Sequence, residues 1–212
     1  NGEVVQASEV LYKKPILVER GRFRPVTKVT LDMLECAQRQ FAHEPQVKGE
    51  DVVTLMEMTL THLTDQGSIN YKDFLDRADL LGSLGKTVLI SNYAEFYRLA
   101  GYLFRYTKKK IGLVMGVPTL RELFEEKYYI DLEGGILESF GRLIRNALRL
   151  YVYPCREKPS GPLITATTLQ VAPHLRHLHQ YLIDNQCIQE LRGFDEHCLP
   201  ILSRDVLAKI RT

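Results

Sequence analysis

Residues 87–115, TVLISNYAEFYRLAGYLFRYTKKKIGLVM, decide the fold class of this chain. They begin with the apolar run 87–90 and end with the apolar run 111–115. Between the two runs, one helical face is formed by Phe96, Leu99, Ala100 and Leu103. Short continuous apolar runs joined by an amphipathic helix are typical of parallel strands buried on both faces of a sheet. The segment therefore predicts a strand–helix–strand unit.

Further apolar runs extend this unit along the chain. Residues 15–18 and 150–153 are continuous apolar stretches of strand length. The crossover before residues 150–153 contains two apolar helix faces, formed by Leu120 and Phe124 and by Ile136, Phe140, Leu143 and Ile144. Because crossovers between parallel strands are almost always right-handed, we predict a βαβααβ arrangement. The expected fold class is α/β, with three layers, a mostly parallel Rossmann-like sheet and flanking helices.

Three more helices are predicted between the first strand and this unit, because apolar residues recur there at intervals of three and four. Their faces are formed by Leu31, Leu34, Ala37 and Phe41, by Val52, Met56, Leu60 and Leu63, and by Phe74, Ala78 and Leu81. With the extended N-terminal segments and the βαβααβ unit they make an α/β domain of residues 1–155. The loop 156–162, with two prolines and a glycine, separates a small helical C-terminal unit of residues 156–212, whose helices begin at Pro173 and Ser203.

The composition is that of a folded globular chain. Of 212 residues, 45% are hydrophobic and 25% are charged. A net charge of +2 lacks the positive excess of a protein held on nucleic acid by phosphate contacts, so we expect no nucleic-acid partner.

Three features predict a cytoplasmic location and no membrane partner. The four cysteines, Cys36, Cys155, Cys187 and Cys198, are too scattered for a disulfide framework and suit a reducing compartment. No apolar run approaches the length of a membrane-spanning helix, and the N-terminus does not resemble a signal peptide. Because the chain starts with Asn1 and not Met, we expect it to be part of a longer polypeptide.

Polar residues follow the predicted strands at the edge where ligands bind in a parallel sheet. Those after residues 87–90 and 111–115 are Ser91, Asn92, Tyr93, Gly116, Thr119 and Arg121. Asn92 and Thr119 each precede a glutamate by three residues, which predicts that they cap helices pointing into one crevice. Such a crevice suits a phosphate or another anion, with Ser91 and Tyr93 as hydrogen-bonding groups. The alternative is that both caps only satisfy backbone donors.

Arginines alternate along residues 20–24. In an extended conformation Arg20, Arg22 and Arg24 would share one face, as in a phosphate-binding surface. We expect Arg20 or Arg22, together with Arg121, to neutralise the ligand. The alternative is a strand edge that charge protects from pairing.

Motifs for catalysis, cofactors or metals are missing. The sequence contains no G-x-G-x-x-G, no P-loop and no G-x-S-x-G. Metal-ligand residue types gather near the C-terminus, namely His174, His177, His179, Cys187, His197 and Cys198, but without C-x-x-C or H-E-x-x-H. We therefore predict no metal site and assign no catalytic residue or cofactor.

Several phrases together resemble the C-terminal half of a family of larger bacterial proteins of unknown function. They are EVLYKKP (9–15), LVERG (17–21), ISNY (90–93), YRL (97–99), MGVP (115–118), LEGGILESFGRL (132–143) and PHLRHL (173–178). The resemblance covers nearly the whole chain and implies an N-terminal half in the same polypeptide. Members of that family are described variously as nicotinate-nucleotide adenylyltransferase or as TonB-dependent receptor.

Both descriptions can be compared with the residues. Adenylyl transfer of this kind uses H-x-G-H and S-x-T-x-x-R-like motifs, whereas residues 174–177 are HLRH and lack the glycine. The N-terminal half would have to supply them. An outer-membrane receptor conflicts with a helix-rich chain that has no Trp, so we expect the second description not to apply.

The sequence thus favours an α/β domain that binds a small anionic or nucleotide-like ligand at the strand carboxyl ends. A non-catalytic interaction or homo-oligomerisation module is the alternative. Nucleotidyl transfer is a third hypothesis, which depends on the N-terminal half.

Overall fold

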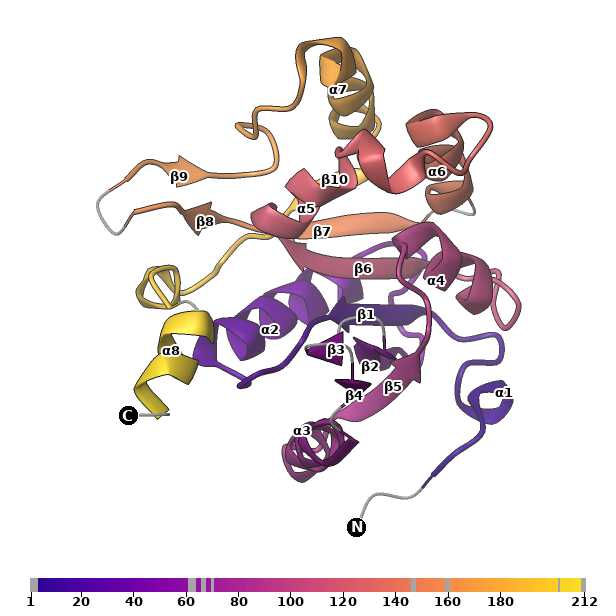
Figure 1. Ribbon diagram of the computed structural model, residues 1–212. Coiled ribbons are helices and arrows are strands. Elements are labelled where there is room, and N and C mark those ends of the chain that lie inside the picture. The colour runs from indigo at the N-terminus through magenta and orange to yellow at the C-terminus, as the bar shows by residue number, and fades with distance from the viewer. Residues whose placement is uncertain are drawn as a thin grey trace.

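A six-stranded parallel sheet forms the centre of the protein (Figure 1). The computed structural model describes residues 4–60, 64–65, 68–69, 71–145, 148–158, 161–201 and 203–210. The strands of this sheet are β1 (Ile16–Arg20), β2 (Val53–Thr59), β5 (Thr87–Ser91), β6 (Ile111–Gly116), β7 (Arg149–Tyr153) and β10 (Ile188–Glu190). Each adjacent pair is parallel, and the spatial order is β10-β7-β6-β1-β2-β5.

This order defines a doubly wound, Rossmann-like fold. Numbered along the chain, the six strands stand in the order 3-2-1-4-5-6. The predicted three-layer α/β class is confirmed. Both strands of the 87–115 unit are present, but they are not neighbours, because β1 and β2 lie between β5 and β6.

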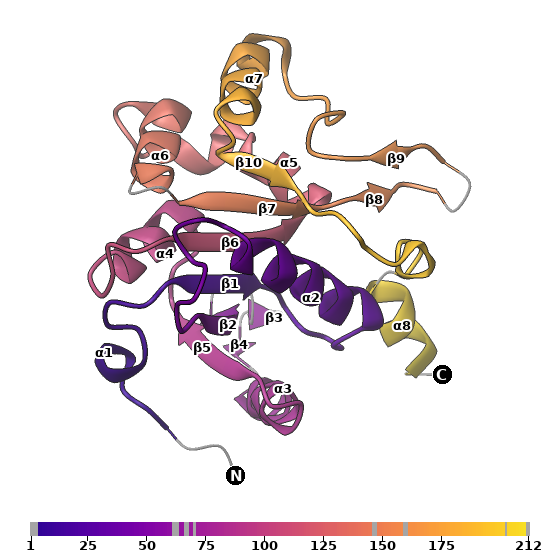
Figure 2. The same cartoon turned by 180° about the vertical axis from the view of Figure 1, so that it is seen from behind.

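Helices cover both faces of the sheet. On one face lie α2 (Lys28–Ala42) and α3 (Tyr71–Ser83), and Figure 2 shows α2 lying across β1 and β6. On the other lie α4 (Phe96–Leu103), α5 (Val117–Leu123), α6 (Gly135–Leu143) and α7 (Arg176–Asp184). Shorter elements are α1 (Ala7–Val10), α8 (Ser203–Ile210) and the 3₁₀ turns η2 (Glu126–Tyr129), η4 (Pro173–Leu175) and η5 (Glu196–Cys198). Two small hairpins pair β3 (Thr64–Asp65) with β4 (Ser68–Ile69) and β8 (Cys155–Arg156) with β9 (Leu163–Ile164).

Strand β1 is buried on both faces of the sheet. Ile16 and Val18 pack on the side of α4, α5 and α6, and Leu17 packs under α2. Gly112, beside Leu17 on β6, leaves the space that large neighbours fill. A methyl group at Gly112 would lie 2.7 Å from Leu17 Cδ1 and 2.8 Å from Tyr151 Cε2.

The helix predicted from Val52, Met56, Leu60 and Leu63 is wrong. Val53–Thr59 form β2, which pairs with both β1 and β5. An interval of four residues returns to the same face of a strand as well as of a helix, so the spacing fits both structures. The run of buried residues from Leu55 to Thr59 is that of a strand covered on two faces. Leu63 lies outside the described residues.

The C-terminal segment is joined to the rest through the sheet. Helical structure begins at Pro173 and at Ser203, as the sequence predicts. The structure adds β10, whose three residues are too few for a periodic signal and which pairs with β7. None of the helices in the described part of the chain is long and apolar enough to cross a membrane.

Candidate functional site

A cavity of about 540 Å³ opens at the carboxyl ends of the strands, beside the topological switch point. From β1 the chain winds through α2 toward β2, and from β6 it winds through α5 and α6 toward β7 on the other side of the sheet. Ligands of doubly wound sheets bind outside the carboxyl ends at this point. The cavity is lined by Arg20, Gly21, Arg22, Ala94, Glu95, Phe96, Thr119, Glu122, Leu123, Tyr128 and Tyr129.

Arg20, the last residue of β1, fixes the inner wall. Its Nε donates to Glu57 Oε2 at 2.5 Å, and its Nη1 and Nη2 donate to the carbonyl oxygens of Ala94 at 2.7 Å and Tyr93 at 2.8 Å. The guanidinium also lies 4.5 Å from the centre of the Phe96 ring. Arg20 therefore holds the loop between β5 and α4, and Glu57 compensates its charge.

Ser91 completes this buried cluster. Its hydroxyl donates to Glu57 Oε1, and it accepts the backbone N–H of Tyr93 at 3.2 Å. Both oxygens of the Glu57 carboxylate are thus engaged. Ser91 and Tyr93 stabilise the wall from behind, and neither belongs to the lining.

The arginine face predicted for residues 20–24 does not form. Strand β1 ends at Arg20, so the three arginines do not lie along one extended strand. Arg22 is exposed at the cavity and makes no ion pair with any described residue. The Nε of Arg24 lies 3.5 Å from Asp73 Oδ1 on α3. The chain turns after Arg20, so Arg22 and Arg24 do not continue the strand.

The turn after β1 is filled by Phe23. Its backbone φ of 47° is in the left-handed region, and its ring is buried among apolar residues of α2, α3 and β2. A methyl group at Gly21 would lie 2.7 Å from Phe23 Cε1. Buried Arg77 of α3 holds the turn by donating to the carbonyl oxygen of Arg22 at 2.7 Å.

Carboxylates and aromatic rings form the outer wall. Glu95 pairs with Arg98 at 2.9 Å, and Glu122 is exposed. Tyr129 is buried and donates to the carbonyl oxygen of Leu123 at 2.9 Å, and burial raises the pKa of its phenol to about 12. Tyr128 is half exposed at the rim. The wall therefore offers acceptors and aromatic surface beside the guanidinium of Arg22.

Both predicted helix caps are wrong. The residue before α4 is Glu95, and the residue before α5 is Gly116; neither cap position makes a side-chain hydrogen bond. Thr119 is instead the third residue of α5 and lines the cavity, whereas Asn92 is exposed outside it. Helix α4 starts later than a cap at Asn92 would require, and helix α5 starts earlier than a cap at Thr119 would require.

Two other predicted residues also lie outside the lining. Arg121 is exposed and pairs with Glu157 at 3.0 Å, and Gly116 precedes α5 without reaching the cavity. Of the eight predicted site residues, Arg20, Arg22 and Thr119 line it.

Sequence reasoning missed Glu95, Phe96, Glu122, Tyr128 and Tyr129. The two glutamates carry a sequence signal, their spacing from Asn92 and Thr119, but that spacing predicts helix capping and not a cavity wall. Phe96 was assigned to the core face of its helix, which is also correct, since it is buried there. The tyrosines had no signal, because only the η2 turn brings them back over the strand ends.

Two of the histidines near the C-terminus, His174 and His179, make structural contacts. His179 is buried, with Nε2 2.9 Å from the carbonyl oxygen of Ala166, and His174 Nε2 lies 2.7 Å from Glu126 Oε2. Within the described ranges, no three His, Cys, Asp or Glu side chains are grouped closely enough to hold a metal ion.

No protein-family model matches this sequence, and a search of curated proteins gives no significant match. The chemistry of the cavity is therefore inferred from its own residues.

Proposed function

We propose that this chain binds a small nucleotide-like anion in the switch-point cavity. The observation that carries the proposal is the position of the cavity, where segments after β1, β5 and β6 meet. Its volume of about 540 Å³ lies in the range of small-molecule pockets.

Each part of the lining suits one part of such a ligand. Arg22, whose charge no described residue compensates, contacts the anionic group. Tyr128, which is half exposed at the rim, provides aromatic surface for a planar base. Glu95 and Glu122 accept hydrogen bonds from sugar hydroxyls or amines. Arg20 and Glu57 form an ion pair that holds the wall in place, so their charges are not available to the ligand.

The turn after β1 limits the size of the ligand. Dinucleotide-binding folds use a glycine-rich turn there, which lets the pyrophosphate approach the backbone. Here Phe23 occupies the turn and packs into the core. A mononucleotide or a phosphorylated sugar fits this arrangement better than a dinucleotide.

Isothermal titration tests the proposal with AMP, GMP, ribose 5-phosphate and inorganic phosphate. We expect at least one organic phosphate to bind, and Arg22→Gln to weaken it about tenfold, because a charge-assisted contact is lost. Arg121→Gln, which removes an exposed arginine outside the cavity, is the matched control and should bind as the original chain does. Absence of binding by all four probes, or equal binding by Arg22→Gln, would contradict the proposal.

The family resemblance extends this proposal. We propose that the domain serves a longer bacterial polypeptide, in which nucleotidyl transfer would depend on motifs supplied by the N-terminal half. A nucleotide bound here would then be held for chemistry carried out by residues outside this chain. Adenylyltransferase assays on the full-length polypeptide test this extension.

A second candidate is an interaction or oligomerisation module, supported by exposed apolar side chains. Leu80 of α3, Leu84 directly after α3, and Ile90 of edge strand β5 are each between 43% and 47% exposed. Light scattering across a concentration series gives the test. A dimer that Leu84→Lys converts to a monomer would favour the module, and a monomer at all concentrations would oppose self-association.

A further inference from the structure

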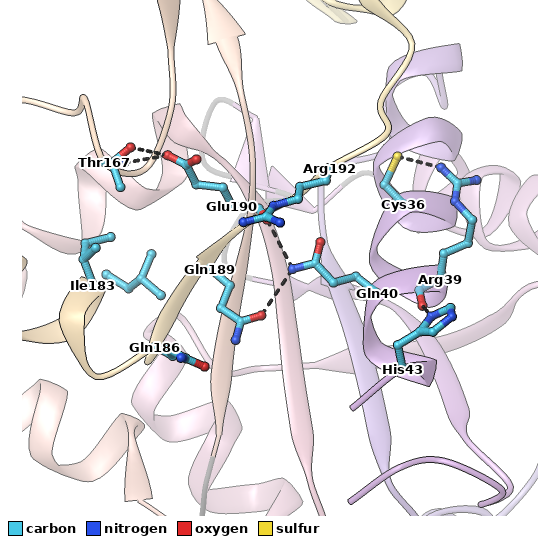
Figure 3. A pocket seen from close by; sticks show the side chains of 11 residues that line it. Cys36, Arg39, Gln40, His43, Thr167, Ile183, Gln186, Gln189, Glu190 and Arg192 are labelled. Atoms are coloured by element: carbon cyan, nitrogen blue, oxygen red, sulfur yellow. Dashed lines mark hydrogen bonds between the residues drawn. The ribbon is translucent and has the colours of Figure 1, made fainter. Parts of the chain in front are cut away.

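A second cavity, of about 680 Å³, lies between α2 and edge strand β10. It shares no lining residue with the switch-point cavity. After β10 the chain runs along α2, where Asp195 donates its backbone N–H to Asp32 Oδ2 at 3.0 Å. The part of the sheet face beside β10 is left open, and Figure 3 shows polar side chains of α2 and β10 facing each other across it.

Two guanidiniums at this cavity form no close ion pair with a described residue, although the charge of Arg192 acts on Glu190. Arg39 Nη2 donates to the carbonyl oxygen of Gly193 at 3.0 Å and to Cys36 Sγ at 3.1 Å, both of which are neutral acceptors. Arg192 extends over the cavity between Glu190 and Gln40 (Figure 3). Both arginines are exposed, and neither forms an ion pair with a residue that the structure describes.

The one carboxylate of the lining is engaged elsewhere. Glu190 accepts the backbone N–H of Thr167 at 2.9 Å and also its hydroxyl, and Figure 3 shows the carboxylate turned toward Thr167. Burial alone would raise the pKa of Glu190, but hydrogen bonds from Thr165 and Thr167 and the charge of Arg192 outweigh it and lower the pKa. Glu190 therefore stays ionised and satisfied, without pairing with either arginine.

Apart from His43, the other side chains of the lining carry no charge. Gln40 Nε2 donates to Gln189 Oε1 and to the carbonyl oxygen of Glu190, both at 3.2 Å, which fixes one wall. Burial, reinforced by Asp32, raises the pKa of the Cys36 thiol to about 11, so it stays protonated at neutral pH. Ile183 is partly exposed and supplies apolar surface, whereas Ile188 is buried.

From these contacts we propose that the cavity between α2 and β10 binds a small organic anion, with one carboxylate, phosphate or sulfonate group on an apolar body. The acidic group contacts Arg39 and Arg192, and the apolar body lies against Ile183. The volume suits a ligand of this size. The proposal concerns a separate site and holds independently of nucleotide binding at the switch point.

Fluorescence titration with 8-anilino-1-naphthalenesulfonate tests it, because this probe joins one sulfonate to an apolar body. We expect saturable binding to the intact chain and about tenfold weaker binding by the double variant Arg39→Gln/Arg192→Gln. The matched control is Arg121→Gln/Arg176→Gln, which removes the same charge from two exposed arginines outside both cavities and should bind the probe as the original chain does. Thermal unfolding of both double variants verifies that they are folded.

Two further measurements distinguish binding at this site from nonspecific binding of the probe to the protein surface. N-Phenyl-1-naphthylamine, which lacks the sulfonate, should bind more weakly than the anionic probe. Equal binding of the two probes, or equal weakening by the two double variants, would overturn the proposal. If Arg39→Gln unfolds the chain, Arg192→Gln alone gives a second readout. Arg192 is exposed, so this single variant should fold and still bind the probe more weakly.

Discussion

Arg20 and Glu57 form an ion pair, 2.5 Å between Nε and Oε2, whose side chains are only 4% and 0% exposed. Removing one partner leaves a buried charge uncompensated, which costs about 3–5 kcal/mol. The Glu57→Gln variant should therefore lose about 3 kcal/mol in the free energy of unfolding, measured with urea.

An exposed ion pair provides the comparison for Glu57→Gln. Lys14 and Asp51 are 2.7 Å apart, with side chains 36% and 79% exposed. Asp51→Asn should cost no more than about 1 kcal/mol, because water already solvates both charges. Equal losses in the two variants would show that burial of the Arg20–Glu57 pair is not decisive.

Glu19 makes stability depend on pH. It is 1% exposed on β1, and its Oε2 has no hydrogen-bond partner in the described part of the chain. Burial raises the pKa of Glu19 well above 4.5, and the charge of Lys86 offsets this only partly. The folded state therefore keeps the proton at a pH where the unfolded state has released it.

The sign of the effect follows from this difference in proton binding. Above about pH 4.5 the unfolded state binds fewer protons at Glu19 than the folded state, so stability falls as pH rises toward the folded pKa. Glu19→Gln removes this contribution, and its advantage over the original chain should grow from pH 5 to pH 8. The measurement is urea unfolding of both proteins at each pH. Parallel stability curves would show that Glu19 does not titrate in this range.

Arg77 should control the order of the turn that carries Arg22. Its guanidinium donates to the carbonyl oxygen of Arg22 at 2.7 Å and to Asp73 Oδ2 at 2.6 Å. Arg77→Ala removes charge-assisted bonds worth about 1.5–3 kcal/mol each. We expect a lower melting temperature and faster amide hydrogen exchange at residues 21–24. If Arg77→Ala changed amide exchange only in α3 and not at residues 21–24, Arg77 would stabilise the helix and not the turn.

The fold was more predictable than the strand order. Runs such as Ile111–Gly116 are recognised because burial on both faces requires apolar residues at every position. Strands β5 and β6 follow each other in the chain but are separated by β2 and β1 in the sheet. This order depends on contacts between segments that are distant in sequence, and the local spacing of apolar residues does not predict such contacts. The same limit explains β2, where a spacing of four fits a helix or a strand until β1 and β5 are placed beside it.

The site was less predictable because side-chain direction depends on where strands and helices end. Arg20 and Arg22 alternate in sequence, yet Arg20 points to Glu57 and Arg22 to the cavity, since β1 stops between them. The sequence predicts that Ser91 faces a ligand, but its hydroxyl donates to Glu57, which is buried on β2. Topology rules predict that the site lies at loops beyond the carboxyl ends of the strands. They do not predict which residues of these loops reach the cavity.

Gly21 is required by the ring of Phe23. A methyl group at Gly21 would lie 2.7 Å from Phe23 Cε1, and this ring is 5% exposed among apolar neighbours, so it has little room to move. We expect Gly21→Ala to cost about 1–3 kcal/mol, as overpacking of a core does. Gly82→Ala is the matched control. A methyl group there meets no atom within 4 Å, and in α3 the substitution should stabilise by up to about 1 kcal/mol. Calorimetric melting of the two variants gives the comparison. A Gly21→Ala protein as stable as the original would mean that the turn shifts freely, and the Phe23 ring would then not restrict the switch-point cavity to small ligands.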